Sequence, residues 1–84
     1  MPDHRPIERI AADLRRVRRL RARFEPGASA AKKIGARQAY DALLVQACDA
    51  LGVEHRLLSL PEGMDREIER LRVEERLRDL GLSV

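Results

Sequence analysis

Aromatic side chains are nearly absent from this chain of 84 residues, which has one Tyr, one Phe and no Trp. Proteins that bind single-stranded nucleic acid commonly stack bases on aromatic rings, so the composition disfavours that mode of binding. The core must instead be built from aliphatic side chains and Ala, and a chain of this size buries only roughly 60% of the surface of its unfolded state. Small domains of this kind often gain stability by pairing, so we expect a homodimer or a protein partner.

Cysteine occurs once, as Cys48, which excludes an intrachain disulfide and is typical of a reducing compartment. Its position on an apolar helix face favours a buried structural thiol over a nucleophile. The two histidines, His4 and His55, are not at a metal-ligand spacing, so neither zinc nor another cofactor is expected. Arg outnumbers Lys by fifteen to two, which indicates a GC-rich bacterial genome.

Long apolar runs are also missing. The first residues include Asp3, Arg5 and Glu8, where a secretory signal would need an apolar stretch, and no later run is long enough to span a membrane. We therefore expect a cytoplasmic protein that does not bind membranes. No catalytic or small-molecule motif is recognisable, and nearly every carboxylate of the C-terminal segment has an Arg one helical turn away. No enzymatic activity is expected; an enzyme would need a concave polar pocket between the helices.

Charge is abundant, and the two halves of the chain differ in sign. Residues 1–37 hold eleven basic and four acidic residues, whereas residues 38–84 hold six basic and ten acidic residues. Most arginines of the first half gather on one side of a helical wheel, opposite an apolar stripe. Arg21 is the exception: it falls near the apolar stripe, where its charge must reach solvent or find a partner. The candidate contacts to nucleic acid or another anionic partner are Arg9, Arg15, Arg16, Arg19, Arg23, Lys32 and Lys33. An acidic protein partner, and a solvated face that reflects codon bias, remain open alternatives.

Helical periodicity predicts a single all-α domain of three helices. The first two helices are expected to form an antiparallel hairpin around Pro26-Gly27, with the third packed across it. Ser29 is the expected N-cap of the second helix, and Gly52 is its expected C-terminal glycine. Residues 53–60 are expected to form a loop or short helical turn that buries its leucines. The expected ranges are a flexible segment at 1–5 and helices at about 6–25, 29–51 and 60–80.

The sequence offers two alternative starts for the third helix and one end. Ser59 and Glu62 match a capping box, although Gly63 leaves open a later start at Asp65. Gly81 fits the glycine that terminates a helix.

Apolar residues of the third helix fall on two nearly opposite faces, of which only one is needed for the intrachain core. The first face has Met64, Ile68 and Leu71; the second has Val73, Leu77 and Leu80. We assign the second face to a protein interface, because an exposed apolar face on a charged helix usually marks an interaction site. The sequence thus predicts a small, non-catalytic interaction or regulatory module that dimerises or docks on a partner. The alternative is a nucleic-acid-associated protein that binds phosphate through the arginines of the first helix.

Overall fold

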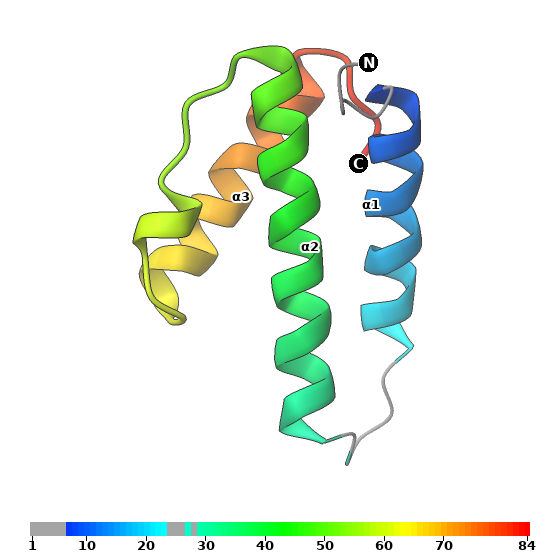
Figure 1. The fold of residues 1–84 in the computed structure, drawn as a ribbon, viewed down its shortest axis with the longest axis vertical. Coiled ribbons are helices and arrows are strands. Elements are labelled where there is room, and N and C mark those ends of the chain that lie inside the picture. The colour runs from blue at the N-terminus through cyan, green and yellow to red at the C-terminus, as the bar shows by residue number, and fades with distance from the viewer. Residues whose placement is uncertain (1–6, 24–26, 28) are drawn as a thin grey trace, which may run out of the picture.

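Three α-helices make up the fold of the computed structural model, which describes residues 7–23, 27 and 29–84. Helix α1 spans Ile7–Ala22, α2 spans Ala30–Leu51 and α3 spans Met64–Asp79, and a short 3-10 helix, η1, spans Leu57–Ser59. Helices α1 and α2 form an antiparallel hairpin, and α3 packs on α2 (Figure 1). This arrangement confirms the expected all-α class. The predicted flexible segment 1–5, residues 6 and 24–25 of the first predicted helix, and Pro26 of the predicted turn lie outside the described residues.

Both ends of α2 are closed by local hydrogen bonds. The Ser29 hydroxyl accepts the backbone N–H of Lys32 at 3.2 Å, as an N-cap does. Gly52 has a φ of 69°, and the N–H of Val53 donates to the Cys48 carbonyl at 2.9 Å. This Schellman ending satisfies a terminal carbonyl and turns Val53 back onto the core.

The start of α3 differs from the predicted capping box. Ser59 belongs to η1, where its hydroxyl donates to the Arg56 carbonyl at 3.0 Å. Because α3 begins only at Met64, the Ser59 hydroxyl does not cap it. The helix begins at Met64 after Gly63, whose φ of 148° suits glycine and whose lack of a side chain leaves the first turn without a side-chain cap. Of the leucines in the connection, Leu57 is buried, whereas Leu58 is exposed.

The end of α3 follows the predicted glycine signal. Gly81 has a φ of 95°, and the N–H of Leu82 donates to the Leu77 carbonyl at 2.9 Å. This bond is the second Schellman ending of the fold, and it brings Leu82 against the core.

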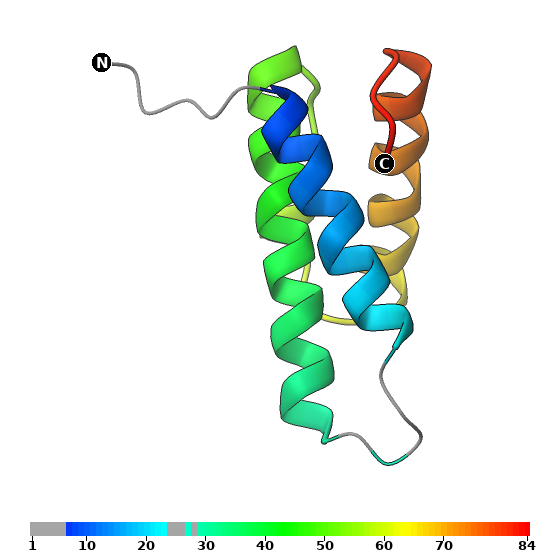
Figure 2. The same ribbon diagram turned by 90° about the vertical axis from the view of Figure 1, so that its right-hand side faces the viewer.

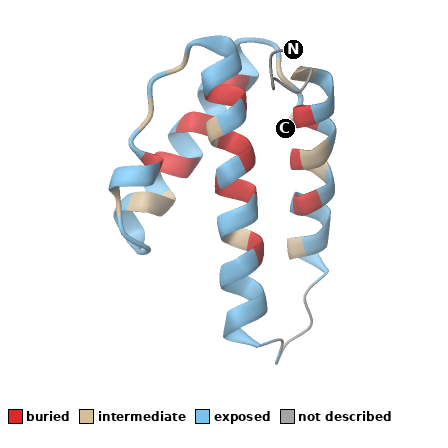
Figure 3. Ribbon diagram, viewed as in Figure 1, coloured by how far each residue is buried: buried red, intermediate tan, exposed pale blue. Residues whose placement is uncertain are grey.

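The core lies between the three helices, whose arrangement Figure 2 shows from the side. Figure 3 marks the buried positions, which occur on all three helices. Tyr40 is its only aromatic member among the described residues, and the rest is aliphatic apart from one thiol. Fully burying one such aliphatic side chain stabilises the fold by about 1.5–3 kcal/mol. The buried cluster consists of Ile10, Leu14, Val17, Tyr40, Leu43, Leu44, Ala47, Cys48, Leu57, Val73 and Leu77.

Candidate functional site

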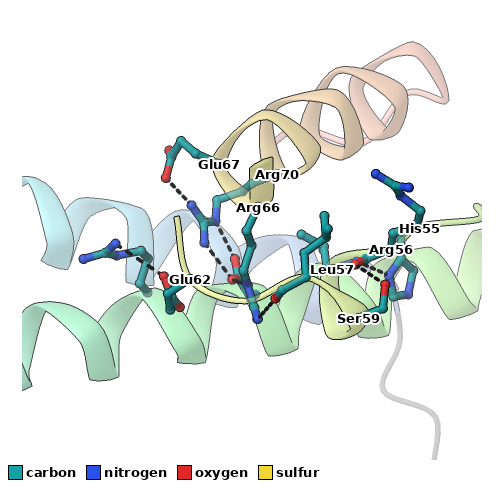
Figure 4. A network of polar contacts seen from close by, with 11 residues as sticks. His55, Arg56, Leu57, Ser59, Glu62, Arg66, Glu67 and Arg70 are labelled. Atoms are coloured by element: carbon teal, nitrogen blue, oxygen red, sulfur yellow. Dashed lines mark hydrogen bonds and ion pairs between the residues drawn. The ribbon is translucent and has the colours of Figure 1, made fainter. Parts of the chain in front are cut away.

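A buried ion pair joins α2 to α3. Asp41 and Arg70 are 1% and 2% exposed, and two parallel bonds join them: Nε to Oδ1 at 2.6 Å and Nη2 to Oδ2 at 2.8 Å (Figure 4). Arg66 donates to the same carboxylate at 3.0 Å and to the Leu60 carbonyl at 2.9 Å, while Glu67 accepts from Arg70. Burial alone would raise the pKa of Asp41, but the bonds and charges of Arg70 and Arg66 outweigh it and lower that pKa.

A second polar contact lies beside the first, on the side of α1. The Tyr40 hydroxyl donates to the buried Glu74 carboxylate, and burial together with this bond raises the pKa of Tyr40. The Arg21 guanidinium lies 5.4 Å from the centre of the Tyr40 ring, a cation–π distance. Arg21 was expected near the apolar stripe of its helix, and the ring is the partner that accommodates its charge there.

A third contact ties the connection between α2 and α3 to α3 itself. Glu69 accepts the backbone N–H of Arg56 at 2.7 Å. It also accepts two hydrogen bonds from Arg72, from Nε to Oε1 at 2.7 Å and from Nη2 to Oε2 at 2.9 Å. The bonds from Arg72 are the largest cause that lowers the pKa of Glu69 to about 2. In the same connection, His55 Nδ1 accepts the N–H of Leu57 at 3.2 Å. The bonds that Glu69 accepts from Arg72 and from the Arg56 N–H therefore favour its charged form.

Together these contacts fix the rotation of α3 about its axis, and they correct the predicted interface. Arg70 shares one helix face with Val73 and Leu77, so directing Arg70 to Asp41 also directs these two side chains into the core, where both are 0% exposed. Val73 and Leu77 therefore hold the chain together and are not available to a partner. Leu80, the third predicted interface residue, follows the helix and is exposed.

The opposite face of α3 is the one left in solvent. Met64, Ile68 and Leu71 are 73%, 58% and 59% exposed and recur at helical spacing, and Glu75 continues the same row. We call these four residues the outer stripe. Leu58 of η1, which packs on α3, is exposed as well. The sequence pattern thus indicated two apolar faces correctly but gave no reason to prefer the right one.

The predicted basic face is distributed along α1. Arg9, Arg16, Arg19 and Arg23 are exposed, and Arg16 lies 3.5 Å from Asp13. Arg15 is half-buried and donates to the Ser83 carbonyl at 2.7 Å, so it holds the C-terminal segment.

The two predicted lysines diverge at the start of α2. Lys32 and Lys33 are both exposed, but only Lys33 joins Arg21 in lining a cleft.

The single thiol is inaccessible. Cys48 is 0% exposed, and burial, with a smaller contribution from Asp49, raises its pKa to about 11. Among the described residues there is no group of three or more His, Cys, Asp or Glu side chains that could hold a metal ion. Within the same ranges, no helix is long and apolar enough to cross a bilayer.

Sequence reasoning missed the buried polar network, although one signal was present. Asp41 lies within the wide apolar arc of α2, between Tyr40 and Leu44, and an acid in such a place requires a buried cation. The identity of that cation is a long-range fact, because Asp41 and Arg70 are 29 residues apart.

No protein-family model, curated protein or solved structure matches this chain.

Proposed function

We propose that this protein is a small, non-catalytic interaction module that self-associates through the outer stripe of α3. The observation that carries the proposal is the exposure of Met64, Ile68 and Leu71 in one continuous row on an otherwise charged helix. Exposed apolar side chains are common singly, but a contiguous row marks an interaction site. The occupant we favour is a second copy of the chain.

The pattern of the stripe supports an antiparallel pair of α3 helices. With a two-fold axis at the midpoint of the stripe, Ile68 lies opposite Leu71 of the second copy, and Met64 lies opposite Glu75. Each Glu75 then approaches the first turn of the facing helix. That turn has no side-chain cap, and its free N–H groups and helix dipole favour a negative charge.

The flank of the stripe is complementary in the same register. Asp65 and Arg76 are eleven residues apart, which places them on one side of the helix, and both are exposed. In the antiparallel pair, each Asp65 lies within about two residues, or ~3 Å along the axis, of Arg76 of the second copy. Two opposite-charge contacts therefore flank the apolar centre, as they do in helix pairs that select an orientation.

A pair of charge-introducing variants tests the proposal. Ile68→Glu places a carboxylate in the centre of the stripe, and Leu20→Glu makes the same change on α1 at a side chain of similar exposure, 50% against 58%. Light scattering on a sizing column should give the wild type and Leu20→Glu a mass that rises above 9.6 kDa with concentration, while Ile68→Glu stays at 9.6 kDa. Equal masses for wild type and Ile68→Glu, or loss of association in Leu20→Glu alone, would contradict the proposal.

Charge reversal tests the register. Arg76→Asp should weaken association about 2- to 30-fold, since it turns two favourable surface contacts into repulsive ones. Adding Asp65→Arg to Arg76→Asp should restore it. A double variant as weak as the single one would exclude the antiparallel register.

Phosphate binding by α1 is the second candidate. Its support is the row formed by Arg9, Arg16, Arg19 and Arg23 along the exposed side of the helix. The affinity for duplex DNA should then fall steeply as salt rises, and neutralising Arg19 and Arg23 should reduce that slope. An unchanged slope would count against this candidate.

A further inference from the structure

A cleft lies where the C-terminal end of α1, the N-terminal half of α2 and the first turns of α3 meet. At this end of the hairpin, α2 extends beyond the start of α3 (Figure 1). The cleft has two adjoining lobes of about 350 and 290 Å³. Arg21 and Glu67 line both lobes, Arg18 lines the larger one, and Lys33 and Arg37 line the smaller one. We call the four basic residues the cationic cleft.

The basic residues of the cleft have few partners. Among the described residues Arg18, Arg21 and Lys33 make no ion pair, and Arg37 reaches Glu62 only at 3.5 Å. A cluster of cations with this little compensation attracts an anion to the space between them.

The acids that line the cleft are already satisfied from within the fold. Glu67 accepts from the buried Arg70, and Glu74 accepts from the Tyr40 hydroxyl. Both acids are therefore held by neighbouring donors. The residues that line the two lobes include five basic and two acidic side chains, so the cleft keeps a surplus of positive charge.

The central cation of the cleft is also held in place. Arg21 lies over the Tyr40 ring, and Tyr40 is fixed in turn by Glu74. A guanidinium oriented in this way loses less freedom on binding than one on a solvated helix face. Arg21 stands between the two lobes, so it is placed to contact an anion in either of them.

We propose that the cationic cleft binds a small phosphate ligand with two linked phosphoryl groups, of the pyrophosphate type. Arg18 and Arg21 contact one phosphoryl group in the larger lobe, and Arg21, Lys33 and Arg37 contact the other in the smaller lobe. Guanidinium groups suit phosphate because their N–H donors match two of its oxygens at once, and lysine adds a point charge. This binding is independent of self-association through α3.

Matched neighbours provide the test. Isothermal titration calorimetry with sodium pyrophosphate measures the affinity of wild type and of three cleft variants, Arg18→Gln, Arg21→Gln and Lys33→Gln. The controls are Arg19→Gln and Lys32→Gln, each of which removes a charge of the same kind from a residue next to the cleft residue but outside the cleft. Each cleft variant should bind about tenfold more weakly than wild type, because it loses a charged hydrogen bond to the ligand. The controls should stay within about twofold, as expected for screened exposed charges.

Two results would overturn the inference: no saturable heat for wild type, or equal losses in cleft and control variants. Far-ultraviolet circular dichroism checks that each variant is folded. If Arg21→Gln does not fold, the inference is tested by comparing the affinity of Arg18→Gln with that of Arg19→Gln, and the affinity of Lys33→Gln with that of Lys32→Gln.

Competition identifies the source of the phosphate. A nucleoside diphosphate that displaces pyrophosphate, with the same dependence on Arg18 and Lys33, supports the cleft. Displacement by duplex DNA that weakens equally in Arg19→Gln would assign the phosphate to the exposed row of α1 and overturn the inference.

Discussion

Asp41→Ala is the substitution that should reveal how much the buried ion pair contributes. It leaves Arg70, which is 2% exposed, without the carboxylate that accepts two of its hydrogen bonds at 2.6 and 2.8 Å. Removing one partner of a buried pair typically costs about 3–5 kcal/mol, because the remaining charge stays buried. Of its described acidic partners Arg70 would keep only Glu67, whose side chain is half exposed, so most of the compensation for its charge is lost. A domain of 84 residues has a total stability of about 4–13 kcal/mol, so the variant should lose a large fraction of it.

Urea unfolding followed by circular dichroism measures the effect. Asp49→Ala is the matched control, since it removes an exposed carboxylate from the same helix and should change stability by no more than about 0.5 kcal/mol. The double variant Asp41→Leu with Arg70→Met should recover much of the loss, because no charge is then stranded. A loss below about 1 kcal/mol in Asp41→Ala would refute the reasoning, since the stranded charge would then carry almost no penalty.

Three further outcomes are expected. Glu69 has a pKa of about 2 against an ordinary 4.5, so the stability that its ionised form contributes is present above pH 4.5 and is lost as pH falls toward 2. The urea midpoint should therefore fall over this pH range in wild type and fall less in Glu69→Gln, and equal decreases in the two proteins would contradict this expectation. Leu77→Glu should unfold the chain by circular dichroism while Leu80→Glu leaves it helical; native helicity in Leu77→Glu would show that Leu77 is not in the core. Cys48 should react with a thiol reagent only in urea, because its burial blocks access and raises its pKa to about 11; rapid reaction in the native state would be inconsistent with this packing.

The local features of the fold were predictable because they depend on neighbours in sequence. The Ser29 cap and the Gly52 and Gly81 endings each involve residues within five positions, and a short pattern identifies them. The start of α3 was the exception. Two local hydrogen-bond schemes compete for Ser59, and its hydroxyl bonds to Arg56 in η1 instead of capping α3.

The candidate interface could not be placed from sequence, because rotation of α3 depends on long-range contacts. Its two apolar faces are similar in hydrophobicity, so periodicity alone does not choose between them. The choice comes from Arg70 on α3, which pairs with the buried Asp41 on α2 and so turns its own face of α3 inward. Val73 and Leu77 lie on that same face and close the core. The exposed row at Met64 and Ile68 is a consequence of that pairing.

Of the cationic cleft, only Lys33 was among the predicted contacts to an anion, and the rest was missed for a related reason. Arg18 and Arg21 come from the end of α1 and Lys33 from the start of α2, and only the antiparallel hairpin brings them together. On the helical wheel of α1, Arg21 was an isolated charge near the apolar stripe, and the Tyr40 ring that holds it is on another helix.

The measurement that most directly tests self-association through α3 is a dilution series of amide nuclear magnetic resonance spectra on the unmodified protein. It reports both whether the chain associates and where, without any substitution. The proposal predicts concentration-dependent shifts concentrated at Met64, Ile68, Leu71 and Glu75. Spectra that do not change with concentration, or changes concentrated around Leu20 on α1, would contradict it.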